Sequence, residues 1–134
     1  MSDALQALLH RIGADEDRLV DFLQAFTRID TCNPPGDTRA GAAFVQAFLD
    51  KAGLPYRRID SQETMPNVVA TTRFDSPGQH PLVLNGHLDV FPVGDRARWS
   101  RNPLSGAIAD GRIRGRGAVD MKCGTTGYGA SEGG

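Results

Sequence analysis

The first third of the chain carries apolar residues at the spacing of amphipathic helices. Over residues 15–29 they recur every three or four positions behind three acidic residues, which the helix dipole favours at an N-terminus. A weaker pattern over residues 4–12 predicts a helix before it. A third helix is predicted to begin near residue 37 or 38 and to end at Gly53, a residue type that commonly follows a helix C-terminus. Between the last two, Asn33-Pro34-Pro35-Gly36 cannot continue a helix and predicts a turn.

Beyond residue 53 the apolar residues gather in short runs typical of β-strands. These runs are residues 56–59, 67–72 and 81–85, and Pro, Gly, Ser or Asp residues separate them. Two further runs flank Asp110-Gly111, a pair that strongly favours a two-residue hairpin. The pattern therefore predicts an α/β fold in which helices are followed by a mixed sheet.

The composition is that of one ordinary globular domain, with 134 residues of which 40% are apolar and 23% charged. The formal charge of −1 comes from 15 basic and 16 acidic residues with no long block of either sign. This balance indicates neither a nucleic-acid partner nor a membrane surface, and it favours a small polar substrate. The sequence shows neither a signal peptide nor an apolar run of about 18 residues, so we expect a cytoplasmic protein. Cys32 and Cys123 form no C-x-x-C pair and are expected to be free thiols.

One histidine and one aspartate stand where a ligand site is expected. The run at 81–85 ends at Asn85-Gly86, so His87 and Asp89 would follow the carboxyl end of a strand, where open α/β sheets bind their ligands. A histidine there can bind a divalent metal through one ring nitrogen, while the carboxylate two residues on orients the ring. Taken alone, the pair is equally compatible with a surface loop.

This pair lies in the first of three sequence blocks that follow one another along the chain. The blocks are Gly86-His87-Leu88-Asp89-Val90-Phe91-Pro92, then Trp99 with Asn102-Pro103-Leu104, then residues 110–122, which contain Gly115-Arg116-Gly117 and Asp120-Met121-Lys122. With them the chain resembles the zinc-dependent amidohydrolase and exopeptidase family of acetylornithine deacetylase, succinyl-diaminopimelate desuccinylase, aminoacylase and glutamate carboxypeptidase. The resemblance implies the N-terminal part of a zinc-exopeptidase-like catalytic domain. It also implies a metal-dependent hydrolase that cleaves the amide bond of N-acyl amino acids or short peptides.

The resemblance implies a role for each candidate site residue. His87 would bind one zinc ion, Asp120 would bridge two zinc ions, and Asp89 would hold His87 in position. Cobalt is a possible substitute for zinc. The family also has a cis peptide directly after the bridging aspartate, which predicts a cis bond between Asp120 and Met121. Apart from the resemblance, Asp120 could simply cap the N-terminus of a helix.

The comparison with the family also identifies residues that this chain lacks. The complete family site adds a Glu-Glu pair, which supplies the general base and a zinc ligand, together with another acidic ligand and a distant histidine. The glutamates here are Glu16, Glu63 and Glu132, and none has a neighbour of its kind. We therefore expect the 134-residue form to be incomplete and inactive as an enzyme. The alternative is a non-catalytic folded remnant that acts as a weak metal-binding or partner module.

The end of the chain departs from the family pattern as well. We expect residues 1–126 to be the N-terminal portion of the catalytic domain, and residues 127–134 to be a glycine-rich tail unlike the family. Glycines cost a helix about 1 kcal/mol each relative to alanine, so the five from Gly124 on predict that the family's apolar helix does not form. A truncated or frameshifted reading frame would explain this departure. The family's dimerisation region is also expected to be absent from this chain.

Overall fold

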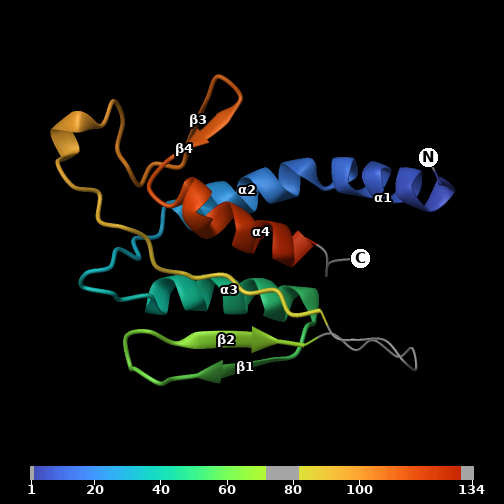
Figure 1. Ribbon diagram of the computed structural model, residues 1–134, viewed down its shortest axis with the longest axis horizontal. Helices are drawn as coiled ribbons and strands as arrows, with labels where there is room; N and C mark the ends of the chain where they lie inside the picture. The colour runs from blue at the N-terminus through green and yellow to red at the C-terminus, as the bar shows by residue number, and fades with distance from the viewer. Residues whose placement is uncertain (1, 72–81, 131–134) are drawn as a thin grey trace.

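The computed structural model describes residues 2–71 and 82–130. Four α-helices and two β-hairpins make up most of the described chain (Figure 1). The α-helices are α1 (Asp3–Ala14), α2 (Glu16–Thr27), α3 (Arg39–Ala52) and α4 (Cys123–Ala130), the strands are β1 (Tyr56–Ile59), β2 (Asn67–Ala70), β3 (Ala107–Ala109) and β4 (Arg112–Arg114), and two short helical turns, η1 (Arg96–Arg98) and η2 (Ala118–Lys122), complete the set. This succession of helices and strands confirms the predicted α/β class.

The three helices predicted from the apolar spacing are all present. Helix α3 begins after Thr38 and is followed by Gly53, whose φ of 68° is the left-handed conformation in which glycine closes a helix. Helix α1 begins after Ser2, whose hydroxyl accepts a hydrogen bond from the Leu5 amide, and it ends at Ala14. The capping residues therefore set the helix boundaries close to where the sequence predicts them.

Helices α2 and α3 pack through four phenylalanine rings. The ring centroid of Phe22 lies 4.8 Å from that of Phe44 and 5.0 Å from that of Phe48, and the rings of Phe26 and Phe44 stack at 5.4 Å. Phe26 is fully buried. Aromatic pairs of this kind contribute about 0.5–1.5 kcal/mol each beyond the apolar area that they bury. This cluster is the centre of the apolar core.

Both β-hairpins are antiparallel. Strand β1 pairs with β2 so that Tyr56 lies opposite Ala70, and β3 pairs with β4 so that Ala107 lies opposite Arg114. The second hairpin turns at Asp110 and Gly111 with φ of 54° and 67°, the positive values that a two-residue turn of this kind requires. The Asp110-Gly111 signal thus located the turn correctly.

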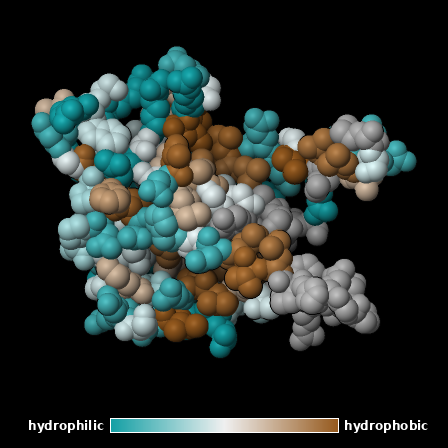
Figure 2. Space-filling view, in the orientation of Figure 1, coloured by the Kyte–Doolittle hydropathy of each residue, from teal (hydrophilic) through white to brown (hydrophobic). Residues whose placement is uncertain are grey.

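The prediction of a strand over residues 81–85 is wrong for residues 82–85, the part that the structure describes. Residues 82–85 lie in an irregular extended segment, and Leu82 and Val83 are 73% and 82% exposed. A strand needs a hydrogen-bonded neighbour, and within the described ranges no other strand lies beside this segment. Apolar surface is visible where the segment passes α3 (Figure 2). Residue 81 itself, and residue 72 of the run predicted over 67–72, lie outside the described ranges.

The expectation that the glycine-rich end forms no helix is also wrong as far as Ala130. Helix α4 includes Gly124, Gly127 and Gly129 and lies beside α2 (Figure 1). The hydroxyl of Thr126, which is buried, donates to the Lys122 carbonyl oxygen at 2.7 Å. Packing against α2 therefore overrides the low helix propensity of glycine.

Two further features of the described chain bear on the sequence predictions. Cys32 and Cys123 are free thiols, as predicted. Among the described residues, none of the helices has both the length and the apolarity that crossing a membrane requires.

Candidate metal site

The segment that carries His87 and Asp89 is held by the turn that follows α2. Residues Cys32 and Val90 form a parallel β-bridge. Around it, the Val90 amide donates to the Thr31 carbonyl oxygen at 3.0 Å, and the Asn33 amide donates to the Val90 carbonyl oxygen at 2.8 Å. The Thr31 hydroxyl donates to the Leu88 carbonyl oxygen at 2.7 Å. Backbone pairing with residues 31–33 thus replaces the predicted strand as the support of the site.

Asp120 reaches the same place from the turn η2. Its backbone is extended, with φ of −120° and ψ of 98°, and the peptide bond to Met121 is cis, as the resemblance predicted. Just before it, Gly117 has φ of 78°, and a Cβ placed there would overlap the Val90 side chain. Only glycine combines this backbone conformation with so close an approach. Gly117 therefore allows the Asp120 turn to lie directly against the His87 segment.

Lys122 fixes the far end of this turn. The side chain is fully buried, and its ammonium donates to the carbonyl oxygens of Phe26 at 2.9 Å and Ile29 at 2.7 Å. It also lies 4.8 Å from the centre of the Phe26 ring. Burial lowers the pKa of this lysine to about 8. The ammonium joins the Asp120 turn to the C-terminal end of α2.

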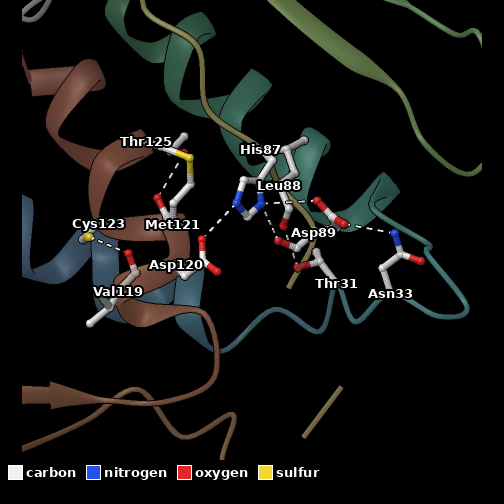
Figure 3. A network of polar contacts seen from close by, with 10 residues as sticks. All are labelled: Thr31, Asn33, His87, Leu88, Asp89, Val119, Asp120, Met121, Cys123 and Thr125. Carbon is white, nitrogen blue, oxygen red and sulfur yellow. Dashed lines mark hydrogen bonds and ion pairs between the residues drawn. The ribbon is translucent and has the colours of Figure 1, made fainter. Parts of the chain in front are cut away.

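The structure brings the three predicted site residues together around one imidazole ring (Figure 3). The Nδ1 atom of His87 lies 2.8 Å from the Asp89 carbonyl oxygen and 3.2 Å from Asp89 Oδ1. The Nε2 atom lies 3.1 Å from Asp120 Oδ1. The three side chains are 45%, 38% and 77% exposed in chain order, so solvent reaches each of them.

Hydrogen bonding on both sides of the ring favours a positive charge on it. Burial lowers the pKa of His87, but the hydrogen bonds that the ring donates to the Asp89 carbonyl oxygen and to the Asp120 carboxylate, together with both carboxylate charges, outweigh burial and raise the pKa above its usual range. Each neighbour of the ring is an acceptor, so Nδ1 must carry a proton and Nε2 requires a proton or a cation between itself and Asp120.

These atoms fit part of a divalent metal site. Metal-bound nitrogen and oxygen atoms lie about 2.0–2.2 Å from a zinc ion, so two of them on one ion are about 3 Å apart. The 3.1 Å between His87 Nε2 and Asp120 Oδ1 matches that separation. In residues 2–71 and 82–130, no group of three or more His, Cys, Asp and Glu side chains is placed to hold a metal ion. The described chain therefore offers two candidate ligand atoms and a carboxylate 3.2 Å from the other nitrogen of the ring.

Sequence reasoning missed the residues that support these three. Asn33 donates from Nδ2 to Asp89 Oδ2 at 3.0 Å, although its Asn-Pro-Pro-Gly context predicted only a turn. Lys122 is the last residue of the third sequence block, but no role was predicted for it. Their partners are 56 and more than 90 positions away in the sequence, which leaves no local signal for either contact.

A histidine and an aspartate at the end of an extended segment therefore face a second aspartate on a glycine-supported turn. Residues 83–130 match the sequence model of peptidase family M20/M25/M40. The chain belongs to this family, as the sequence blocks predicted.

Its relatives include a desuccinylase, a deformylase and an aminoacylase. Over 91 residues it is 44% identical to a succinyl-diaminopimelate desuccinylase of Cereibacter sphaeroides, covering 66% of this chain and 23% of that protein. It is 31% identical to an N-formyl-4-amino-5-aminomethyl-2-methylpyrimidine deformylase of Halalkalibacterium halodurans, with 90% and 29% covered. It is 38% identical to aminoacylase-1 of Sus scrofa, with 78% and 26% covered. The chain thus spans less than a third of the length of these relatives.

Proposed function

We propose that this chain supplies His87, Asp89 and Asp120 to the divalent metal site of an amide hydrolase. One observation carries the proposal: His87 Nε2 faces Asp120 Oδ1 at 3.1 Å while Asp89 holds the opposite nitrogen of the ring. That arrangement leaves one nitrogen lone pair and one carboxylate directed at the same point, which a cation can occupy.

The roles of the three residues follow from their atoms. His87 would bind one ion through Nε2, and Asp120, with two oxygens and 77% of its side chain exposed, would bridge two ions. Asp89 would keep the proton of the ring on Nδ1. Zinc is the metal that we propose, with cobalt as a substitute. When bound, two such ions supply a hydroxide near neutral pH and polarise the amide carbonyl.

The substrate class that we propose is an N-acyl amino acid or a short peptide. It is supported by the names of the relatives, which remove succinyl, formyl or acyl groups. The reaction is hydrolysis of the amide bond that joins the acyl group to the amine.

We further propose that the 134 residues alone do not carry out this hydrolysis, because none of the described glutamates lies near His87 to act as the general base. Glu16 lies in the first turn of α2 and Glu63 lies between β1 and β2, and both are exposed. Glu132 lies outside the described ranges. Without a carboxylate to take the proton of the attacking water, the chain would bind metal without turnover.

Cobalt titration of the purified chain, followed by its visible absorption, tests the metal site. We expect weak saturable binding that is lost in His87→Ala and in Asp120→Ala. The matched control is His10→Ala, which removes an exposed histidine of α1 and should leave binding unchanged. Cobalt binding that survives both site substitutions would place the metal elsewhere and refute the proposal.

An activity assay tests the second part. The cobalt-loaded or zinc-loaded chain, incubated with a panel of N-acyl amino acids, is expected to release no free amino acid. Hydrolysis that disappears in His87→Ala would show that the chain contains its own general base and is an active enzyme.

A further inference from the structure

We propose that Asn33 is a positioning residue of the metal site, which sets the Asp89 carboxylate against the His87 ring. This inference rests on the proposed function, because the purpose of the positioning is to present His87 Nε2 to a metal ion. None of the three sequence blocks includes Asn33, which lies in the turn between α2 and α3.

The contact between the two side chains is specific. Asn33 Nδ2 donates to Asp89 Oδ2 at 3.0 Å, and the other oxygen of the same carboxylate lies 3.2 Å from His87 Nδ1. A carboxylate only accepts hydrogen bonds, so the amide must present its nitrogen to Asp89. Figure 3 shows the carboxylate between the amide on one side and the imidazole on the other. With both oxygens engaged in opposite directions, the carboxylate cannot rotate without losing a partner.

Backbone hydrogen bonds hold the turn that carries the Asn33 side chain. The Asn33 backbone amide donates to the Val90 carbonyl oxygen, one residue beyond Asp89, at 2.8 Å. The turn is closed by the Gly36 amide, which donates to the Cys32 carbonyl oxygen at 2.9 Å. Gly36 has φ of 86°, and a Cβ there would overlap the end of the Met65 side chain and lie 3.0 Å from Asn33 Oδ1. Gly36 thus lies close to the Asn33 amide oxygen, while the amide nitrogen donates to Asp89.

A neutral donor suits this place better than a charged one. A lysine or arginine would form an ion pair with Asp89 and weaken its attraction for the His87 proton. An aspartate, which has the same shape as asparagine, would remove the donor and add a like charge. The amide orients the carboxylate and leaves its negative charge for the imidazole, which favours the ring proton on Nδ1 and frees the Nε2 lone pair for a cation between Nε2 and Asp120.

The test uses Asn33→Asp and Asn33→Ala in the 134-residue chain, with Asn67→Ala as the matched control in the exposed hairpin strand β2. The first readout needs no metal: nitrogen NMR of the His87 ring, at a pH where the ring is neutral, reports which nitrogen carries the proton. The signal is assigned with His87→Gln. We expect a larger population with the proton on Nδ1 in the parent chain and in Asn67→Ala than in either Asn33 variant, in which the population shifts toward Nε2. Urea unfolding of each variant identifies any that fail to fold.

The second readout is the affinity for cobalt. Removing a group that orients a metal-binding histidine weakens binding by about 10- to 100-fold, and Asn33, which acts through Asp89, is expected to give the lower value of about 10-fold. Unchanged proton position and affinity in both Asn33 variants, with binding still lost in His87→Ala, would overturn the inference and leave the proposed function intact. If the parent chain binds no cobalt through His87, the proposed function fails. The metal-free NMR readout alone then tests the positioning role of Asn33. A shift of the ring proton in the Asn33 variants supports that role, and an unshifted proton overturns it.

Discussion

Replacing Lys122 by methionine tests the tie between the Asp120 turn and the rest of the fold. Methionine has nearly the length of lysine and fills the same space, but it lacks the ammonium that donates to Phe26 at 2.9 Å and to Ile29 at 2.7 Å. The Phe26 carbonyl oxygen keeps a second donor, the Ile29 amide at 3.2 Å. The Ile29 carbonyl oxygen loses its ammonium partner.

The expected loss can be estimated from the contacts. Two hydrogen bonds from a charged group contribute about 1.5–3 kcal/mol each, and the buried cation over the Phe26 ring adds about 1–2 kcal/mol. Against this, burial of the ammonium lowers its pKa from 10.5 to about 8, which corresponds to a cost of about 3 kcal/mol for the charged form. The contacts outweigh the cost of burial, so Lys122→Met should lower the free energy of unfolding by about 3 kcal/mol.

Urea unfolding followed by far-ultraviolet circular dichroism measures this loss. With a denaturant dependence of about 1–3 kcal/mol per molar urea, the midpoint should fall by about 1 M or more. The control is Lys51→Met, which changes the other lysine of the chain at an exposed position in the last turn of α3 and should leave the midpoint within the error of the measurement. Equal midpoints for the two variants would show that the buried ammonium adds no net stability and that the estimate is wrong.

Two further substitutions test other parts of the fold. Gly117→Ala should destabilise the chain by about 2–4 kcal/mol, because residue 117 has a left-handed backbone conformation and its new methyl group would overlap Val90. Gly13→Ala in α1 has open space around it and should be neutral or stabilise the chain by up to about 1 kcal/mol. A lower urea midpoint for Gly13→Ala than for Gly117→Ala would contradict this prediction. Hydrogen bonds from Arg39 lower the pKa of Asp37 from 3.8 to about 2. The contribution of Asp37 to the free energy of unfolding is therefore present above pH 4 and is lost as the pH falls toward 2. Asp37→Asn should remove that part of the acid dependence of unfolding, and an unchanged acid profile would refute the assignment.

The parts of the fold that the sequence predicted well are those with local causes. Asp110-Gly111 determines its hairpin because both residues accept positive φ, and Gly53 ends α3 for the same reason. The strand expected at 81–85 failed because an apolar run becomes a strand only beside a partner, and its sequence contains no information about that partner. The helix expected to fail near Gly124 formed because contacts with α2, far away in the sequence, override the local preference of glycine.

The same distinction applies to the site. His87, Asp89 and Asp120, the residues of the proposed site, could be selected because they lie inside sequence blocks with recognisable spacing. Asn33 and Lys122 were not, because their importance depends on atoms that only folding brings within 3.0 Å of them. A turn-forming Asn-Pro-Pro-Gly segment and a buried lysine have no local signature of a supporting role.

The supports of the site have one property in common, which predicts how it responds to change. Most of them are hydrogen bonds to backbone carbonyl oxygens. The Thr31 hydroxyl donates to Leu88, the Asn33 backbone amide donates to Val90, and the Lys122 ammonium donates to carbonyl oxygens at the end of α2. In the described chain, the buried apolar residues that accompany them are few, namely Phe26, Ala42, Leu49, Val90 and Ala118. The position of the His87 ring relative to Asp120 therefore depends more on hydrogen bonds between segments than on the tightness of the core. Substitutions that break one of these bonds should weaken metal binding by more than their effect on stability alone would suggest, whereas substitutions within the phenylalanine cluster should lower stability and metal binding together.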